Sequence, residues 1–501
     1  MPISETGQVP GVRPDTATPE GFEAPQWSRI DTYILAVLLL ASLATRFPAL
    51  GYPPSIVFDE WFTVTSARLY LHHLPNKETH PPLAGELIAT SIALFGDHPA
   101  SWRLASAVLG TVLVMITYLL MRRMFLSRMA AALASLFVLC DGQFLIDSRT
   151  GHWEIFYLTF GAWAYLMLFR FMQSTDPLAR RRSLAWMGVA LGLSLASKLG
   201  IPLVTITLVM GWVMFAIMRH APAGLRDGDF APLRQIAGAF ALVGGLTALV
   251  YLALYLPNYW FGFWHGVSDQ ITYYRGELKF QTSLPPRHPQ NSPWWSWPLM
   301  LRPIRYWHQT DFLALPGAEV ASIRGIGNPI TWWGLVVAIP LVTREAIARK
   351  NMPRTFLVVG YAAYLAMWIP ISRYKFTYYY MPALYLGFMT LAVLLAECWD
   401  DEARSFEHVA LLAAMLPSMI LGLGTGPGLA AAATTAAGYL LSLRRSRRYA
   451  GRFVFACYVG AALIAFAYFL PVSTGMPISP AALHARMWMH GPGLANWAGP
   501  S

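Results

Sequence analysis

The chain has 501 residues, of which 56% are hydrophobic and 13% are charged. The charged share is about half of that in ordinary soluble domains, so the composition excludes a typical soluble protein and predicts a membrane protein. The formal charge of +11 would suggest a nucleic-acid partner for a soluble chain. Here the basic residues lie between apolar runs, which indicates that they set membrane topology, and no nucleic-acid partner is expected.

The N-terminal segment, residues 1–30, is polar and rich in proline. It lacks a basic region followed by an apolar core, so it predicts a disordered cytoplasmic tail and not a cleaved signal peptide. The first apolar run, residues 33–47, is then expected to be an uncleaved signal anchor.

Apolar runs along the rest of the chain predict an all-α polytopic membrane protein with about thirteen spans, at roughly 20 residues per crossing. The predicted spans are 32–48, 102–121, 129–147, 152–171, 184–198, 201–218, 236–256, 329–342, 355–371, 376–396, 408–424, 426–443 and 453–471. The pair 184–198 and 201–218 stays open, because residues 197–200 fit either a tight turn or a kink within one long helix.

The basic residues predict one orientation for all the spans, with the N-terminus in the cytoplasm. Short inward loops then hold these basic residues: Arg122, Arg123, Arg128, Arg180, Arg181, Arg182, Arg219, Arg226, Arg234, Arg344, Arg349, Lys350, Arg354, Arg444, Arg445, Arg447, Arg448 and Arg452. The predicted location is the cell membrane, specifically a bacterial inner membrane, with membrane lipids as neighbours.

This orientation divides the chain into parts with separate expected roles. We expect an N-terminal transmembrane module over 31–256, which includes the first outer loop, 49–101. An outer segment, 257–328, a C-terminal transmembrane module, 329–472, and an outer tail, 473–501, follow.

The first outer loop contains the carboxylate pair Asp59-Glu60, then His80-Pro81-Pro82-Leu83 and an amphipathic stretch over 83–95. Carboxylates near a bilayer are costly, and they mark a pathway, a proton relay or a reaction centre. A polar loop that ends in a rigid turn favours a reaction at the membrane surface on a lipid-linked substrate.

Further basic residues lie on the predicted outer side, where topology does not explain them. They are Arg68, Lys77, Arg103, Arg149, Lys198, Arg275, Lys279, Arg287, Arg302, Arg305, Arg324, Arg373, Lys375 and Arg486. One interpretation is that their side chains reach lipid headgroups. The other is a pocket for a lipid phosphate, for which Arg149 and Arg373 are the leading candidates.

The outer segment 257–328 is rich in proline and contains Trp260, Trp264, Trp294, Trp295, Trp297 and Trp307. Tryptophan belongs at the headgroup level of a membrane, so an interfacial belt is one interpretation. The other is a lid whose rings stack on a sugar or hold an acceptor peptide.

Several motifs, taken in order, resemble those of the protein O-mannosyltransferases that use dolichyl- or polyprenyl-phosphate mannose, in their short bacterial form. The similarity covers roughly residues 30 to 400. The matching motifs are Asp59-Glu60, His80-Pro81-Pro82-Leu83, Phe95-Gly96-Asp97 with Trp102-Arg103, Ser148-Arg149, Ser197-Lys198, His288-Pro289, Ser292 to Leu299, Asn328-Pro329, Trp332-Trp333, Arg373, Phe376 and Tyr378-Tyr379-Tyr380.

This resemblance implies a C-type integral-membrane glycosyltransferase. Such enzymes move mannose from polyprenyl (dolichyl-type) phosphate mannose to a Ser or Thr hydroxyl of a protein, with inversion at the anomeric carbon. The chain departs from the family at Glu154, where an aspartate is common. The segment 257–328 is also too short for the soluble sugar-binding-like repeats of the eukaryotic enzymes.

The resemblance and the chemistry together suggest roles for individual residues. Asp59 is the predicted base, and Glu60 is either the alternative base or the residue that positions Asp59. His80 makes either a turn hydrogen bond or a substrate contact. The remaining candidates are Arg149, Arg373, Arg103 and Lys198 for donor phosphate, Glu154 as partner of one of these arginines, and His288 and Trp297 on the acceptor side.

No pair of residues has the spacing of a metal motif, and no cofactor is required by the sequence. A divalent metal shared by Asp59, Glu60 and His80 stays open. Two other functions also stay open. One is a related enzyme that transfers another polyprenyl-linked sugar to a lipid, such as an aminoarabinose transferase acting on lipid A. The other is a transporter, which predicts repeated spans and charges near the midplane that the sequence does not show.

Overall fold

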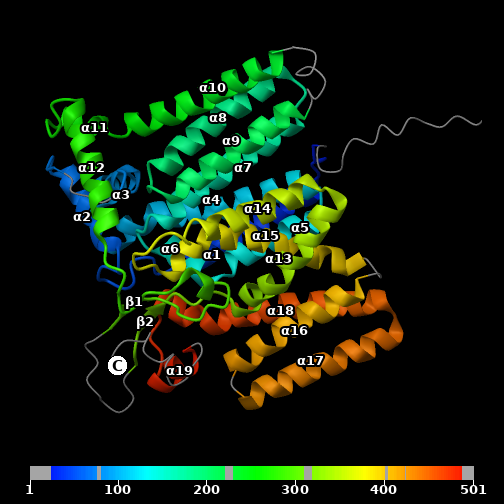
Figure 1. The fold of residues 1–501 in the computed structure, drawn as a ribbon. Coiled ribbons are helices and arrows are strands. Elements are labelled where there is room, and N and C mark those ends of the chain that lie inside the picture. Colours follow the sequence, from blue (N-terminus) through cyan, green and yellow to red (C-terminus); the bar gives the residue numbers. More distant parts are fainter. Residues whose placement is uncertain are drawn as a thin grey trace, which may run out of the picture.

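The computed structural model describes residues 24–75, 80–219, 230–309, 319–400, 404–423 and 425–487. These residues form a bundle of helices (Figure 1), and two short strands lie at one end. Most of the predicted tail 1–30, Lys77 and Arg226 fall outside the described residues. The first helix begins at Arg29, where the Ser28 side chain caps it together with Asp31.

Each predicted span overlaps one long helix, with one exception. The helices are α1 Arg29–Arg46, α4 Pro99–Phe125, α5 Arg128–Leu139, α6 Gly142–Arg149, α7 Glu154–Gln173, α8 Pro177–Leu195, α9 Ile201–Met218, α10 Ala231–Ala253, α13 Pro329–Arg349, α14 Met352–Ala366, α15 Met381–Asp400, α16 Ser405–Leu423, α17 Thr425–Arg445 and α18 Arg447–Thr474. The exception is the predicted span 129–147, which is divided between α5 and α6.

Among the described residues, seven helical segments are long and apolar enough to cross a membrane, or eight if the bent pair α5 and α6 counts as one span. The predicted number of about thirteen is therefore not confirmed. Helices α1 and α8 each contain three charged residues, and α14 has only 15 residues. Because of these charges, or of this short length, these three helices are not among the segments that are long and apolar enough to cross a membrane.

The break between α5 and α6 bends the chain by 61°. Asp141 stabilises the start of α6, because its carboxylate accepts hydrogen bonds from the backbone N–H groups of Gln143 and Phe144. The same carboxylate accepts from Asn328 and Trp332 at the start of α13. This bend sets the direction of α6, which carries Asp147 and Arg149.

Helices α8 and α9 are separate, so residues 196–200 form a break and not a continuous helix. Gly200 has a φ of +88°, a conformation that glycine adopts without a steric penalty. The break places Lys198 between two helix ends and outside both helices.

The remaining elements gather around one end of the bundle, which we call the site end (Figure 1). They are α2 Glu60–Leu71, α3 Leu83–Phe95, α11 Leu256–Trp260, α12 Val267–Ser283, η1 Trp294–Ser296, β1 Arg305–His308, β2 Ser322–Arg324, η2 Thr377–Tyr380 and α19 Pro480–Ala485. Strands β1 and β2 pair antiparallel, with Arg305 opposite Arg324 and His308 opposite Ser322. The predicted outer segment 257–328 is thus structured over its described residues.

The opposite end of the bundle, which we call the basic end, collects the arginine-rich helix termini (Figure 1). These termini include the end of α4 with Arg122 and Arg123, the start of α8 with Arg180 to Arg182, the end of α13 with Arg349, and the end of α17 with Arg444 and Arg445. The predicted inward loops therefore share one end of the molecule, as a single membrane orientation requires.

Candidate active site

Asp59 lies directly before α2 at the site end. Its side chain makes no capping bond to the helix, and it is partly exposed. The hydroxyl of Tyr378 donates to Oδ2 of Asp59 at 3.2 Å. Burial and the Glu154 carboxylate raise the pKa of Asp59, although His152 and Lys198 act in the opposite direction. With respect to the residues that the structure describes, Asp59 thus keeps acceptor positions free, and it has a raised proton affinity, as a general base requires.

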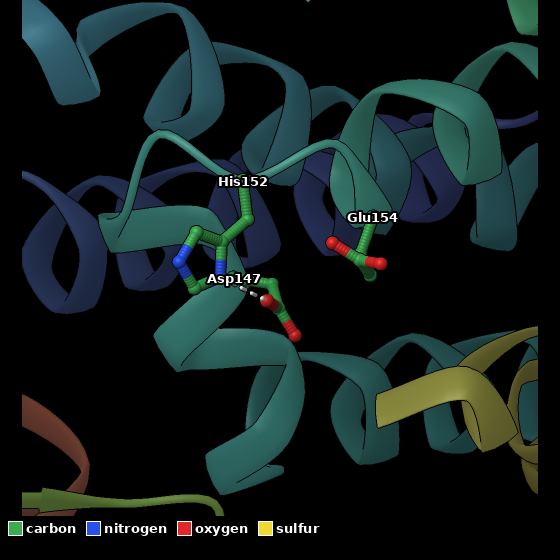
Figure 2. Close-up of side chains that lie close together, drawn as sticks. All are labelled: Asp147, His152 and Glu154. Atoms are coloured by element: carbon green, nitrogen blue, oxygen red, sulfur yellow. Dashed lines mark hydrogen bonds and ion pairs between the residues drawn. The ribbon is translucent and has the colours of Figure 1, made fainter. Parts of the chain in front are cut away.

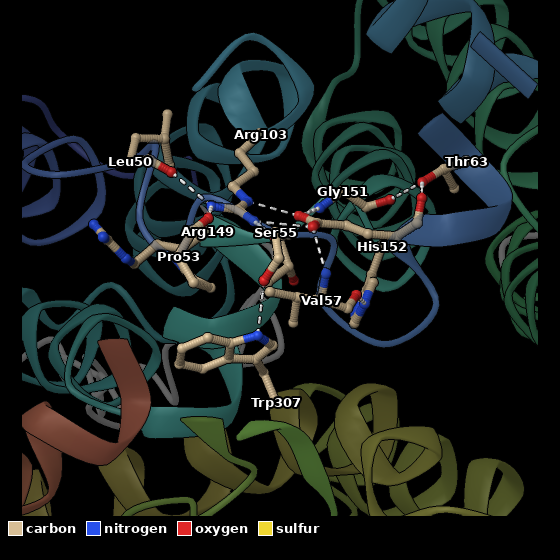
Figure 3. Close-up of polar contacts among 12 residues, drawn as sticks. Leu50, Pro53, Ser55, Val57, Thr63, Arg103, Arg149, Gly151, His152 and Trp307 are labelled. Atoms are coloured by element: carbon tan, nitrogen blue, oxygen red, sulfur yellow. Dashed lines mark hydrogen bonds and ion pairs between the residues drawn. The ribbon is translucent and has the colours of Figure 1, made fainter. Parts of the chain in front are cut away.

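Glu60, the next residue, is fully buried and fully bonded. Its carboxylate pairs with Arg103 at 2.7 Å, and it accepts backbone N–H bonds from Val57 at 2.9 Å and Gly151 at 3.0 Å. Figure 3 shows the surrounding contacts. Of its two predicted roles, this geometry favours the one in which Glu60 positions Asp59.

Arg103 is enclosed by acceptors of the protein itself (Figure 3). Two of its five bonds go to Glu60, and the other three go to the carbonyl oxygens of Leu50, Pro53 and Ser55. The guanidinium has five N–H donors, and all of them are occupied. The prediction that Arg103 binds donor phosphate is therefore wrong, and Arg103 instead fixes the first loop.

Arg149 binds the backbone where α1 ends and the first loop begins. Its guanidinium donates to four carbonyl oxygens at or just after the end of α1, those of Thr45, Arg46, Pro48 and Ala49. These carbonyls lack helical partners, and a cation near a helix C-terminus satisfies them. Three of these bonds come from Nη1 and one from Nη2, so they do not occupy all five N–H donors of this guanidinium. The phosphate contact predicted for Arg149 therefore stays a prediction.

Lys198 reaches the site from the break between α8 and α9. Its ammonium forms an ion pair with Glu154, so the expectation that Glu154 pairs with an arginine is also wrong. The same ammonium lies 5.1 Å from the ring centre of Tyr379 and 5.6 Å from that of Tyr378. Although burial alone would lower the pKa of Lys198, Glu154 raises it, so the side chain is a cation.

His80 packs against the ring of Trp153 and feels the charges of Lys198 and Arg373. Its ring centre lies 4.5 Å from that of Trp153, and its buried Nδ1 has no hydrogen-bond partner among the described residues. Burial and the charges of Lys198 and Arg373 hold its pKa well below the usual range. His80 is therefore a neutral imidazole with a free polar atom, as a substrate contact requires.

Arg373 approaches from the segment before η2. Its Nη1 donates to the side-chain oxygen of Gln281 at 2.8 Å, and its guanidinium lies 5.8 Å from the ring centre of Tyr379. It is partly exposed, and Nη1 is its one bonded donor in the described parts of the chain. Unlike Arg103, Arg373 thus keeps donors for a ligand within the described residues.

The two residues predicted for the acceptor side differ. His288 is partly exposed, and its ring lies 5.0 Å from Phe376 and 5.1 Å from Tyr374. Trp297 is fully buried, and its indole donates to the hydroxyl of Ser292 at 2.9 Å. Trp297 thus belongs to the core, and its predicted role on the acceptor side stays a prediction.

Three residues at the site were not predicted from the sequence. Tyr378 occurs in a motif that carried the family resemblance, but no role was assigned to it. Asp147 and His152 flank the Ser148-Arg149 pair, and nothing in their spacing indicates that they pair with each other and contact the loop that carries Asp59. The bend before α6 and the loop before α7 bring them there.

Asp147, His152 and Glu154 are close enough together to be considered for a divalent cation (Figure 2), because one N or O atom from each side chain lies within 4.8 Å of the other two. Each already has a partner, however. Glu154 pairs with Lys198, and Asp147 lies 3.2 Å from Nδ1 of His152. These bonds favour a network of ion pairs.

The chain matches three family models. Residues 36–102 and residues 79–252 each match a family described as dolichyl-phosphate-mannose-protein mannosyltransferase. Residues 269–491 match the C-terminal region of protein O-mannosyltransferases, which has four transmembrane segments. The matches therefore include both halves of the helical bundle.

Curated relatives extend over nearly the whole chain. The polyprenol-phosphate-mannose–protein mannosyltransferase of Mycolicibacterium smegmatis is 26% identical, and the alignment covers 91% of each chain. The enzyme of the same name from Mycobacterium tuberculosis is 23% identical, with 96% of this chain and 95% of the relative covered. The one from Corynebacterium glutamicum is 26% identical over 80% of this chain and 89% of its own length.

Two solved structures share the fold. The S. cerevisiae protein O-mannosyltransferase Pmt1-Pmt2 complex bound to the sugar donor superposes with a TM-score of 0.73, at 14% identity over 94% of each chain. ArnT from Cupriavidus metallidurans bound to undecaprenyl phosphate gives 0.56 at 15% identity, over 90% of this chain and 78% of that one. The predicted all-α C-type glycosyltransferase fold is thereby confirmed. With the family matches and the curated relatives, these findings show that the chain belongs to the dolichyl-phosphate-mannose–protein mannosyltransferase family of membrane glycosyltransferases.

Proposed function

We propose that this protein transfers mannose from polyprenyl phosphate mannose to Ser or Thr hydroxyls of proteins, with Asp59 as the general base. One observation carries the assignment of the base. Among the described residues, Asp59 has one hydrogen bond, at 3.2 Å from Tyr378, whereas Glu60 beside it is buried and accepts from Arg103, Val57 and Gly151. The named activity of the curated relatives supports the choice of donor and acceptor.

The reaction is a single displacement. The acceptor hydroxyl gives its proton to the Asp59 carboxylate while its oxygen attacks the anomeric carbon. The bond between that carbon and the phosphate oxygen breaks, and its electron pair leaves with the polyprenyl phosphate. Attack opposite to the leaving group inverts the configuration. A positioned base contributes typically about 10²–10⁴-fold to such a step.

Lys198 and Arg373 are the proposed ligands of the donor phosphate. Both charges act on His80 and lower its pKa, and both cations lie near the ring of Tyr379, at 5.1 Å for Lys198 and 5.8 Å for Arg373. Cationic donors fixed where negative charge develops stabilise the leaving phosphate. The unpartnered Nδ1 of His80 adds one polar contact, to either the phosphate or the sugar.

The acceptor is proposed to enter past His288 and the described part of segment 257–328. His288 packs against Phe376, whose ring stacks on that of Tyr378 at 5.5 Å, and Tyr378 contacts Asp59. The positive charges at the basic end support placing the site end on the outer face of the membrane. The proposed location is thus the bacterial inner membrane, with the site facing away from the cytoplasm.

A direct test uses the purified full-length chain with polyprenyl phosphate mannose and a Ser/Thr-rich peptide. Formation of a mannosylated peptide whose anomeric configuration is opposite to that of the donor is the expected result. If lipid A-type acceptors or another polyprenyl-linked sugar react and the peptide does not, the protein-acceptor assignment is overturned. The lipid-directed alternative then replaces it.

A further inference from the structure

A buried pair beside Asp59, formed by Asp147 and His152, has no part in the steps above. His152 lies in the loop between α6 and α7, and Asp147 lies on α6 (Figure 2). Nδ1 of His152 is 3.2 Å from Oδ1 of Asp147. On the other side of the ring, Nε2 is 3.3 Å from the carbonyl oxygen of Val57.

Both nitrogens of this ring therefore face acceptors. A neutral imidazole has one N–H, whereas an imidazolium donates from both nitrogens. The Asp147 carboxylate is held in turn by Nε2 of Gln143, at 2.6 Å from its Oδ2, and by the Tyr306 hydroxyl, at 3.5 Å from its Oδ1. The geometry fits an imidazolium paired with a carboxylate.

The groups that face His152 stabilise its charge. Burial alone would lower the pKa of His152, but the hydrogen bond to Asp147 and the carboxylates of Asp147, Asp59 and Glu154 raise it to about 9. Tyr306 stacks on the ring with centres 5.2 Å apart. His152 is thus charged at neutral pH and loses its proton as the pH rises through about 9.

The contact with Val57 connects this pair to Asp59. The N–H of Val57 is held by Glu60 at 2.9 Å, and its carbonyl is held by His152. Phe58 follows with a φ of +45°, which is unusual for a residue other than glycine and persists only where neighbours enforce it. Its ring lies 6.1 Å from that of His152. The turn that directs Asp59 is therefore fixed from both sides.

We propose that His152 is a positioning residue for Asp59, kept as an imidazolium by Asp147 and holding the Val57 carbonyl ahead of the turn. It acts through the backbone and does not touch the substrate. The proposal rests on the proposed function, because its main readout is mannosyl transfer. The test therefore includes wild-type protein and Asp59→Asn, which together report on the function independently of His152.

The first variants are His152→Gln, which keeps one donor without the charge, and His152→Leu, which keeps neither. For His152→Gln we expect kcat to fall by about 10- to 100-fold, as for a small misplacement of a reacting group, with KM for donor and peptide within about twofold of wild type. The kcat of His152→Leu should fall further than that of His152→Gln. A wild type and a His152→Gln variant with equal kcat would overturn the inference and leave the proposed function intact, whereas an inactive wild type would overturn both.

Asp147→Asn separates positioning from simple folding. An asparagine can still accept from Nδ1. Its new N–H₂ replaces the oxygen that faces Nε2 of Gln143, so the Gln143 amide has to turn over and present Oε1, which has no partner among the described residues. The charge that stabilises the imidazolium is removed, so the alkaline fall in kcat should move from about pH 9 toward about 6.5, the ordinary histidine value. An alkaline limb at the wild-type position in Asp147→Asn would overturn the inference.

A stability measurement tests the proposal even if the His152 variants have no transfer activity. Because the pKa of folded His152 is raised, its proton stabilises the fold fully below about pH 6.5. This contribution is lost as the pH rises through about 9. The difference in melting temperature between wild type and His152→Gln should therefore shrink across that range. A difference that is constant from pH 6 to pH 10 would overturn the imidazolium assignment.

Discussion

The two ends of the bundle both contain carboxylates, but these carboxylates have different surroundings. At the basic end, Asp31 is fully buried and accepts from Arg122 at 2.7 Å, Tyr118 at 2.9 Å and Arg128 at 3.1 Å. At the site end, Asp59 is partly exposed and accepts from Tyr378 at 3.2 Å. A saturated carboxylate is a structural group, whereas one with free acceptor positions can take a proton from a substrate.

The same contrast separates residues within the site end. Glu60 and Arg103 satisfy each other and the backbone, so they resemble Asp31 and its arginines. In the described parts of the chain, Nδ1 of His80 has no hydrogen-bond partner, and Arg373 donates from Nη1 alone. Buried polar groups are normally hydrogen-bonded, so free ones gathered at one place indicate a binding site.

The largest expected effect on stability is for Glu60→Gln. This change leaves Arg103 as a buried charge without its partner, and breaking a buried ion pair in this way costs about 3–5 kcal/mol. Thermal unfolding of the purified protein measures the loss. Asp31→Asn should lose stability by a similar mechanism, yet each folded molecule should retain full transfer activity.

The Asp31→Asn and Glu60→Gln variants test the proposed difference between the two ends of the bundle. An Asp31→Asn protein that is folded but inactive would show that the basic end takes part in catalysis. A Glu60→Gln protein as stable as wild type would show that the first loop does not depend on the Arg103 pair.

The next effect concerns the donor phosphate. Lys198→Met removes a cation from the proposed phosphate site and should lower transfer by about 10- to 100-fold, in the range of one lost oxyanion-type contact. It also leaves Glu154 unpaired, so stability falls as well. In the double variant with Glu154→Gln, stability should recover while transfer stays low.

Recovery of transfer in the double variant would contradict the phosphate role of Lys198. It would indicate that this lysine serves only to neutralise Glu154. The assay is the same peptide mannosylation, measured per folded molecule.

The smallest expected effect is the pH dependence of stability at Asp59. The pKa of this carboxyl is raised in the folded protein by burial, so its ionisation works against folding. Its protonated form stabilises the fold below about pH 4, the ordinary aspartate value, and this contribution is lost as the pH rises through the folded pKa. Asp59→Asn should therefore be at least as stable as wild type at pH 7, and the two should converge toward pH 4.

A melting temperature for Asp59→Asn that lies below that of wild type at pH 7 would place Asp59 among the structural carboxylates. The proposed difference between Asp59 and Asp31 would then not hold for stability, whatever the transfer activity of the variant.

Much of the helical bundle could be predicted from the sequence, because apolar runs and basic loops reflect local physical constraints. The break between α5 and α6 could not, since it depends on Asp141 bonding to Asn328 and Trp332, far along the chain. In the site, Asp59, Lys198 and Arg373 were named from their motifs and positions.

For Arg103 and Arg149, the sequence does not predict which groups their guanidinium ions bind. A sequence identifies a cation at a helix end but not the acceptor it meets, and here the acceptors are backbone carbonyls. Asp147 and His152 were missed for the converse reason. Their pairing and their contact with Val57 arise from the direction of α6, which no local pattern specifies.

The most direct test of the division between Asp59 and the saturated carboxylates compares Asp59→Asn with Asp97→Asn in the peptide mannosylation assay. Asp97 is a matched control, since it lies at the same end in an exposed pair with Arg68 at 2.8 Å, of a kind worth about 0–1 kcal/mol. The account predicts that Asp59→Asn folds normally and loses about 10²–10⁴-fold in kcat, while Asp97→Asn stays close to wild type. Transfer by folded Asp59→Asn at the wild-type rate would contradict it.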